Sequence, residues 1–153
     1  MDAPLARIRE ALELIRTRTP RRYRRIRRDV HRLVIIAAGG AEYWPRVDGM
    51  ALTRGELTNH STEEVAFTIV HEATHARLWR MGIPYARALR DRIERLCVRE
   101  EVVFAQTLPD ADRWIAEIQR PLATPWWTDD AIRERRSSAW RELLRPPSDK
   151  GGE

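Results

Sequence analysis

Two histidines and a glutamate stand close together in the run His71-Glu72-Ala73-Thr74-His75. On a helix, His71 and His75 lie one turn apart on the same face, where both imidazoles can bind one metal ion. Glu72 lies about 100° around the helix from His71, so its carboxylate can reach a metal-bound water without coordinating the metal. The spacing therefore predicts a mononuclear zinc site that activates water, with Glu72 as general base.

The usual role of an isolated histidine on a helix is that of a hydrogen-bonded core residue. Two histidines and a carboxylate at this spacing are harder to explain in that way, because a separate face of the same helix is apolar. That face carries Val65, Ala66, Ile69, Ala73 and Ala76. The pattern therefore favours a metal site on a face that is not needed for packing.

A hydrolytic zinc site needs a third protein ligand and an open position for water, whereas a structural zinc site has four protein ligands. The next predicted helix offers Glu94, Glu100 and Glu101. Glu101 is the preferred ligand, because the small residues Cys97 and Ala105 one turn away would let the two helices approach closely. Glu100 is the second choice, since it lies near the middle of an apolar stripe, where a metal would offset the cost of burying a carboxylate. The alternative for either residue is an ordinary surface or ion-paired glutamate.

Other residues with chemical potential have simpler explanations. His60 stands just before a helix start and His31 lies in a distant strand, so both are poorer ligands than a glutamate of the next helix. Tyr43, Tyr85 and His60 could each stabilise an oxyanion, although packing or capping is the commoner role of such residues. Cys97 is expected to be a packing residue rather than a ligand or nucleophile.

The elements that must position these residues are predicted to form an α+β domain. Apolar residues at spacings of three and four favour an N-terminal helix. A β-branched stretch that ends at Gly39-Gly40, followed by extended stretches before and after the Asp48-Gly49 turn, favours a small, largely antiparallel sheet. The predicted helices cover residues 4–16, 62–81, 85–107, 111–119 and 129–144, and the predicted strands cover residues 30–38, 41–46 and 50–57.

The helix that carries the two histidines has the clearest boundaries. Ser61 precedes Glu64 by three residues, which is the pattern of a reciprocal capping box. Gly82 and Pro84 end the helix, the first by accepting a left-handed conformation and the second by blocking continuation. The short turn that follows should fold the next helix back against it, which a third ligand on that helix requires.

The C-terminal part of the chain is expected to contribute less to the site. Residues 121–127 form a connector in which Trp126 and Trp127 are expected to fasten the chain onto the core, with a groove or partner contact as the alternative. Residues 146–153 are polar and are expected to form a disordered tail.

Composition limits where the protein acts. The longest apolar stretch, residues 33–41, is about half the length of a bilayer-spanning helix, and the N-terminus lacks the apolar region of a secretory signal. The single cysteine excludes an internal disulfide and fits a reducing compartment. These features predict a cytoplasmic protein with no membrane partner.

The net charge of +5 depends on arginine, because the chain contains a single lysine. Nine of the arginines fall within residues 16–32, where they could attract phosphates or acidic surfaces. A solvated helix face is the commoner explanation of such a run, and the chain contains no familiar nucleic-acid motif. Nucleic-acid binding is therefore the less favoured hypothesis.

The run from His71 to His75, followed by a glutamate on the next helix, resembles the gluzincin metallopeptidases. More narrowly, the middle third of the chain is similar to compact bacterial zinc peptidases. The residues that carry this narrower similarity are His71 to His75, Gly82, Glu94, Cys97, Glu101 and Ala105.

The resemblance implies a zincin-like fold over residues 1–145, taken as a single domain. It implies one Zn²⁺ held by His71, His75 and Glu101, and cleavage of peptide bonds with Glu72 as base. It also implies a peptide or protein substrate aligned on an edge strand, for which residues 50–57 are the expected strand. The alternative is a non-catalytic, zinc-bearing interaction module whose arginine-rich surface binds nucleic acid or an acidic protein.

Overall fold

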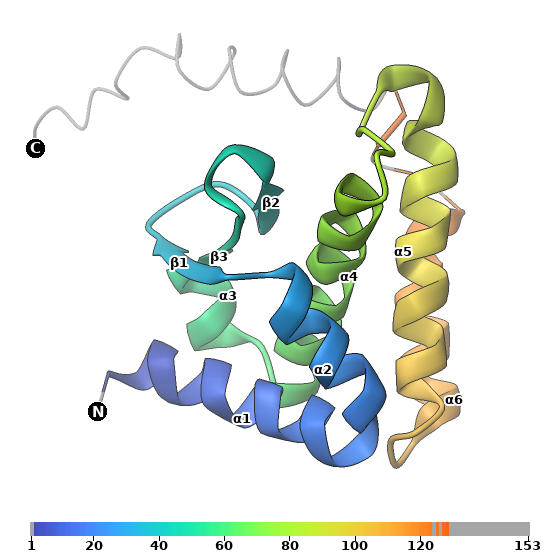
Figure 1. Cartoon of the computed structure of the whole chain (residues 1–153). Helices are drawn as coiled ribbons and strands as arrows, with labels where there is room; N and C mark the ends of the chain where they lie inside the picture. The colour runs from blue at the N-terminus through green and yellow to red at the C-terminus, as the bar shows by residue number, and fades with distance from the viewer. Residues whose placement is uncertain (1, 124, 126, 129–153) are drawn as a thin grey trace, which may run out of the picture.

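The chain begins with two helices, where the sequence predicted one. A computed structural model describes residues 2–123, 125, 127 and 128. In it, α1 (Ala3–Arg18) is followed by Thr19, whose φ of −139° is not helical, and α2 (Pro20–Asp29) starts directly afterwards. Pro20 suits the first position of a helix, where its missing N–H costs nothing. The two helices meet at an angle and cover one side of the molecule (Figure 1).

The arginine-rich run forms α2, to which the sequence analysis assigned no element. This helix buries Arg22, Ile26 and Asp29, which lie on one face at spacings of four and three. Its other positions are mostly exposed arginines. Two of these three buried residues are charged, so the helix shows no apolar periodicity in the sequence.

Within the described residues, three strands form a mixed sheet in the order β1-β3-β2. Strand β3 (Gly49–Thr53) pairs parallel with β1 (Arg32–Ile36) and antiparallel with β2 (Glu42–Trp44). The predictions of a largely antiparallel sheet and of an edge strand at residues 50–57 are therefore wrong. β3 is the central strand, and all of its residues are buried.

Gly49 is required by the close approach of β1 to β3. A Cβ atom at this position would lie 3.0 Å from Cβ of Arg32 and 3.1 Å from the Arg32 carbonyl oxygen. Asp48, immediately before it, has a φ of +51°, which turns the chain from β2 into β3. The Asp48-Gly49 turn predicted from the sequence is thus confirmed.

The last predicted strand ends early because a second capping box starts a helix. Oγ1 of Thr53 accepts a hydrogen bond from the backbone N–H of Glu56, and the Glu56 carboxylate accepts one from the backbone N–H of Thr53. These bonds initiate α3 (Arg54–Asn59). The Thr53 to Glu56 spacing is the same signal that the sequence analysis used at Ser61.

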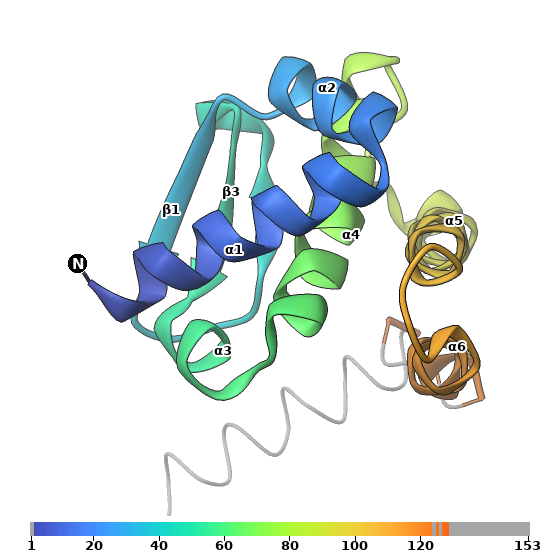
Figure 2. The same ribbon diagram turned by 90° about the horizontal axis from the view of Figure 1, so that it is seen from below.

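The histidine-bearing helix is confirmed closely. α4 (Thr62–Arg80) begins with reciprocal hydrogen bonds between Ser61 and Glu64. Gly82, with a φ of +77°, turns the chain after its last residue, and the N–H of Ile83 bonds the Leu78 carbonyl. α4 lies between the sheet and α1 on one side and α5 and α6 on the other (Figures 1 and 2).

The second half of the described chain packs on the far side of α4. α5 (Arg90–Ala105) is shorter than the predicted helix at residues 85–107, because its first part forms a loop and a 3-10 turn, and α6 (Ala111–Gln119) follows as predicted. The ring of Phe67 packs edge-on against Phe104 and Trp114, with centroids 5.8 and 5.4 Å away.

The short 3-10 helices are η1 (Pro45–Val47), η2 (Arg87–Leu89) and η3 (Arg120–Leu122).

Two predictions concern the C-terminal region. The predicted helix at residues 129–144 and the tail at 146–153 lie outside the described residues.

In the part of the chain that the structure describes, no helix combines the length and apolarity needed to cross a membrane.

Candidate metal centre

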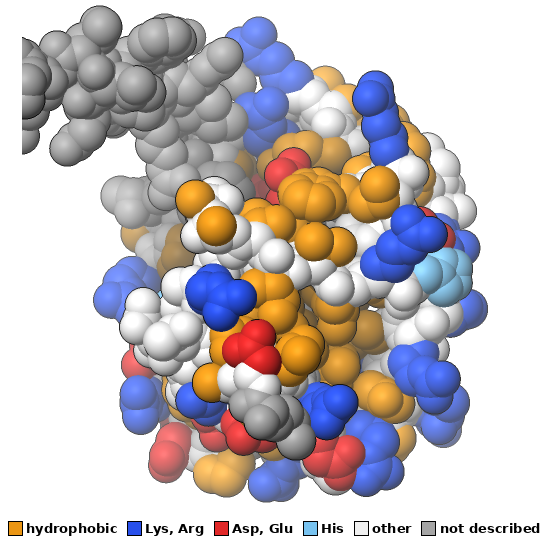
Figure 3. Space-filling model, turned by 90° about the vertical axis from the view of Figure 1, so that its left-hand side faces the viewer, with side chains coloured by type: hydrophobic (Ala, Val, Ile, Leu, Met, Phe, Trp, Pro, Cys, Tyr) orange, Lys and Arg blue, Asp and Glu red, His pale blue; other side chains and the backbone are white. Residues whose placement is uncertain are grey.

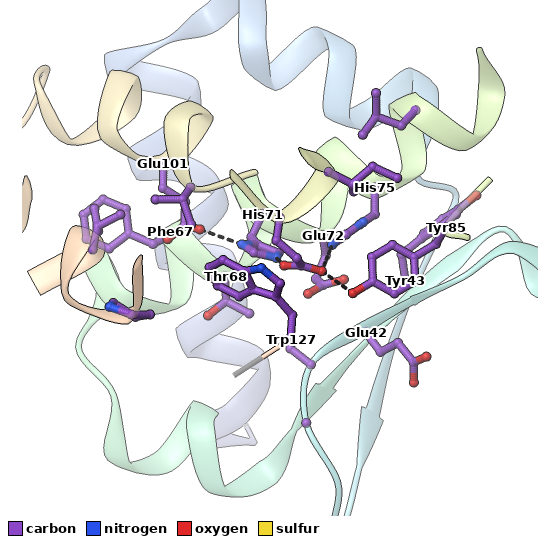
Figure 4. Close-up of a pocket in the computed structure, with 18 of the residues that line it drawn as sticks. Glu42, Tyr43, Phe67, Thr68, His71, Glu72, His75, Tyr85, Glu101 and Trp127 are labelled. Carbon is purple, nitrogen blue, oxygen red and sulfur yellow. Dashed lines mark hydrogen bonds and ion pairs between the residues drawn. The ribbon is translucent and has the colours of Figure 1, made fainter. Parts of the chain in front are cut away.

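His71 and His75 lie side by side on α4 and line a cavity. Their ring centroids are 5.1 Å apart, and their side chains are 16% and 14% exposed. Figure 4 shows both imidazoles directed into the cavity, with Glu72 beside them. The predicted helical spacing therefore brings the two rings together at a surface that solvent can reach.

The carboxylate of Glu94, on α5, lies close to Nε2 of His71 and to Nε2 of His75. Its Oε2 lies 3.2 Å from Nε2 of His71, and its Oε1 lies 3.6 Å from Nε2 of His75. The side chain is 1% exposed, and the contact of Oε2 with His71 is an ion pair that lacks hydrogen-bond geometry. Two imidazole nitrogens and one carboxylate therefore converge on one point.

Glu101, the preferred ligand of the sequence analysis, contacts the opposite edge of one histidine. Its Oε1 lies 2.6 Å from Nδ1 of His71, on the side away from His75 (Figure 4). A carboxylate at Nδ1 fixes the ring orientation and leaves Nε2 directed at Glu94. The geometry thus places Glu101 behind His71 rather than beside Nε2.

Glu100, the second choice, is not brought to the histidines. Its carboxylate accepts a hydrogen bond of 2.8 Å from Nη2 of Arg22, and its backbone carbonyl accepts one of 2.7 Å from Nη1 of the same guanidinium. Arg22 is 7% exposed. The pair joins α2 to α5, which is the ion-paired alternative considered for this residue.

The candidate base, Glu72, is buried beside His71. Burial raises the pKa of Glu72 to about 7, although the charge of His71 and a hydrogen bond from the backbone N–H of Tyr43 oppose that rise. A carboxylate with a pKa near neutrality is well matched to exchange protons at neutral pH.

The two histidines differ in charge when no metal is present. Burial alone would lower the pKa of His71, but its interactions with Glu101 and Glu94 prevail and raise the pKa to about 10. Burial and the nearby charge of His71 lower the pKa of His75 to about 4. Burial disfavours ionisation of Glu94, yet His71 and a hydrogen bond from Tyr85 lower its pKa overall. The metal-free cluster therefore holds a proton on His71.

The tyrosines and remaining histidines have distinct positions. The hydroxyl of Tyr85 donates a 2.5 Å hydrogen bond to Oε1 of Glu94, and its ring packs edge-on against His75. The hydroxyl of Tyr43 instead donates to Asp48. His31 also pairs with Asp48, and His60 lines the cavity near the start of α4. Among the oxyanion candidates, Tyr85 is the one that reaches the His75 and Glu94 pair.

Cys97 lies beneath the same cluster. It is fully buried on α5, and its Sγ and one nitrogen from each of His71 and His75 all lie within 4.8 Å of one another. Burial raises the pKa of its thiol, and the charge of Glu94 adds to the effect. The sequence alone predicts a packing role for Cys97, because its position one turn after Glu94 becomes informative only once Glu94 is placed at the histidines.

The cavity beside this cluster has a volume of about 910 Å³. Its walls come from α4, the β2 edge, α5, α6 and the segment after α6. Trp127 belongs to that last segment: it is 2% exposed, and its Nε1 donates a 2.9 Å hydrogen bond to Asp91. The prediction that Trp127 fastens the connector is confirmed, while Trp126 lies outside the described residues.

The arginines do not concentrate on the face seen in Figure 3. That view shows basic side chains around its rim, separated by apolar and uncharged groups. On α2, Arg22 is buried against Glu100, and Arg28 pairs with Asp29.

Comparison of the chain with models of protein families, with curated proteins and with solved structures gave no match in any of the three.

Proposed function

We propose that this protein is a zinc-dependent hydrolase that cleaves peptide bonds, with one Zn²⁺ held by His71, His75 and Glu94 and with Glu72 as general base. The observation that carries the proposal is the convergence of Glu94 on Nε2 of both histidines. Glu94 takes the ligand role that the sequence analysis gave to Glu101.

The donor set suits zinc. Two imidazoles and one carboxylate are the ligands of a hydrolytic zinc site, which leaves one position for water. A carboxylate that is 1% exposed is costly without a counter-charge. The proton on His71 supplies that charge in the metal-free cluster, and a divalent cation would replace it with a larger charge shared by both imidazoles.

The residues around the cluster divide the work of hydrolysis. Zinc, when bound, supplies a Lewis acid that lowers the pKa of water towards 7. The Glu72 carboxylate accepts a proton from the attacking water and passes it to the amide nitrogen of the leaving group. Glu101 holds the ring of His71, and the Tyr85 hydroxyl holds Glu94, so that both ligands keep their orientation.

The test compares zinc content and turnover in Glu72→Gln. This substitution keeps the shape of the side chain and removes its basicity. We expect one zinc ion per chain, as in the wild type, and a loss of peptide hydrolysis of about 100-fold or more. Wild-type protein that binds zinc but cleaves no peptide, or a variant with full activity, would refute the proposal.

A second candidate function is a non-catalytic, zinc-bearing interaction module. Cys97 favours it, since a thiolate there would be a fourth protein ligand and would close the site. The exposed arginines of α2 would then form the interaction surface for nucleic acid or an acidic protein. In that case Cys97→Ser would lose zinc, and nucleic-acid affinity would be strongly salt-dependent and unaffected by Glu72→Gln. The hydrolase proposal expects Cys97→Ser to keep zinc and activity.

A further inference from the structure

The cavity extends along α4 on both sides of the candidate metal centre. α4 lines it from Glu64 to Trp79, with His71 and His75 between these limits. At 1.5 Å per helical residue, the lining reaches roughly 10 Å from His71 to Glu64 and roughly 6 Å from His75 to Trp79. The histidines therefore lie within a groove and not at its closed end.

Both ends of the groove are bordered by side chains that solvent reaches. Trp79 and Tyr85, at the end beyond His75, are 46% and 47% exposed. At the end beyond His71, α6 forms the wall. There Trp114 packs on Phe67, and the side chain of Glu117 is 37% exposed. A chain lying in the groove can thus enter at one end and leave at the other.

These dimensions fit an extended polypeptide segment. At about 3.3 Å per extended residue, the two arms hold about three residues beyond His71 and about two beyond His75. The volume of 910 Å³ is near the upper end of the usual range of ligand pockets, roughly 300–1,000 Å³. A pocket for a chain terminus needs to extend on only one side of the scissile bond.

On this basis, and resting on the proposed hydrolase function, we infer that the protein is an endopeptidase that cleaves internal bonds of extended polypeptide segments. The substrate lies along α4 between the β2 edge and α5–α6. β2 spans only three residues, Glu42–Trp44, so side-chain contacts in the two arms supply most of the substrate binding.

The experiment uses the full-length, zinc-loaded chain and peptides of eight residues. One set carries an acetylated N-terminus and an amidated C-terminus, a second set has free termini, and aminoacyl anilides represent minimal exopeptidase substrates. We expect blocked and free peptides to be cut at the same internal bond at similar rates, as shown by mass spectrometry, with the anilides cleaved at least 100-fold more slowly.

Two results would overturn the inference in different ways. Stepwise loss of single residues from free peptides, with blocked peptides left intact, would make the protein an exopeptidase and leave the proposed hydrolase function standing. No cleavage of any substrate by the zinc-loaded protein would remove the hydrolase function and the inference together.

A variant at the exposed end of the groove gives a second readout. Trp79→Ala removes a groove contact beyond His75 without opening the core, because the side chain is 46% exposed. We expect KM for the blocked eight-residue peptide to rise about tenfold, as loss of one aromatic contact predicts, with kcat nearly unchanged. Met81→Ala is the matched control, since Met81 is 62% exposed and does not line this cavity. Equal KM values in the two variants would contradict a substrate path past Trp79.

Discussion

Glu100 and Glu101 are neighbours in sequence but belong to different parts of the molecule. Glu101 contacts Nδ1 of His71, whereas Glu100 binds the guanidinium of Arg22 on α2. Consecutive residues of a helix point about 100° apart, so α5 presents one carboxylate to α4 and the next to α2. The comparison shows that the role of a glutamate on α5 depends on which helix it faces. Glu94, two turns earlier, faces α4 like Glu101 and reaches the other ring nitrogen.

The largest expected effect belongs to Glu94. Glu94→Gln removes the only carboxylate that meets Nε2 of both histidines among the described residues. We expect zinc affinity to fall by roughly 1,000-fold, about 4 kcal/mol, with loss of hydrolysis. Competition with a chromophoric chelator measures this affinity. A variant that retains wild-type affinity would return the ligand role to Glu101.

Glu101→Gln should have an intermediate effect. The amide can still contact Nδ1 of His71 but no longer supplies the negative charge that orients the imidazole and increases its basicity. We expect zinc affinity to fall by about 10- to 100-fold, with one zinc ion still bound at saturating metal. The same chelator titration ranks the two variants. A larger loss in Glu101→Gln than in Glu94→Gln would reverse the assignment.

Zinc binding should depend on pH through His71. Interactions with Glu101 and Glu94 raise the pKa of His71 to about 10, so at neutral pH zinc must displace a proton from this ring. Affinity should therefore rise about tenfold per pH unit between roughly pH 5 and 8. Calorimetry in buffers of different ionisation enthalpy should detect about one proton released per zinc at neutral pH. Binding that does not vary with pH would show that His71 is not a ligand.

Glu100→Gln should have the smallest effect on zinc. The substitution weakens the bond to Arg22 and leaves a buried guanidinium without its counter-charge. We expect the free energy of unfolding to fall by about 2 kcal/mol, since the Glu100 side chain is 31% exposed. Urea denaturation of the metal-free protein measures this change, and the chelator titration should match the wild type. A clear loss of zinc affinity would mean that the two glutamates are not functionally separate.

The sequence predicted α4 well because its signals are local. Capping at Ser61, termination at Gly82 and the spacing of His71 and His75 act within one or two helical turns. Apolar periodicity does not reveal α2, because tertiary contacts, above all that between Arg22 and α5, stabilise a helix with little apolar surface. The parallel pairing of β1 with β3 was also missed, since strand direction depends on the path of the whole chain.

The third ligand depends on two helices together. The small and apolar neighbours that favour Glu101 and Glu100 in the sequence lie on α5 and describe that helix alone. α4 and α5 are antiparallel about a turn near Tyr85, so residues equally far from that turn face each other. His75 and Glu94 are such a pair. The position of this connection relative to the histidines therefore favours Glu94 over Glu101.

X-ray absorption at the zinc edge of the zinc-loaded protein tests the ligand assignment most directly. If His71, His75 and Glu94 hold the metal with one position left for water, the spectrum should show nitrogen and oxygen ligands at about 2.0–2.2 Å and no sulfur. A sulfur ligand at about 2.3 Å, abolished by Cys97→Ser, would mean that a fourth side chain closes the site. That result would contradict the hydrolase proposal.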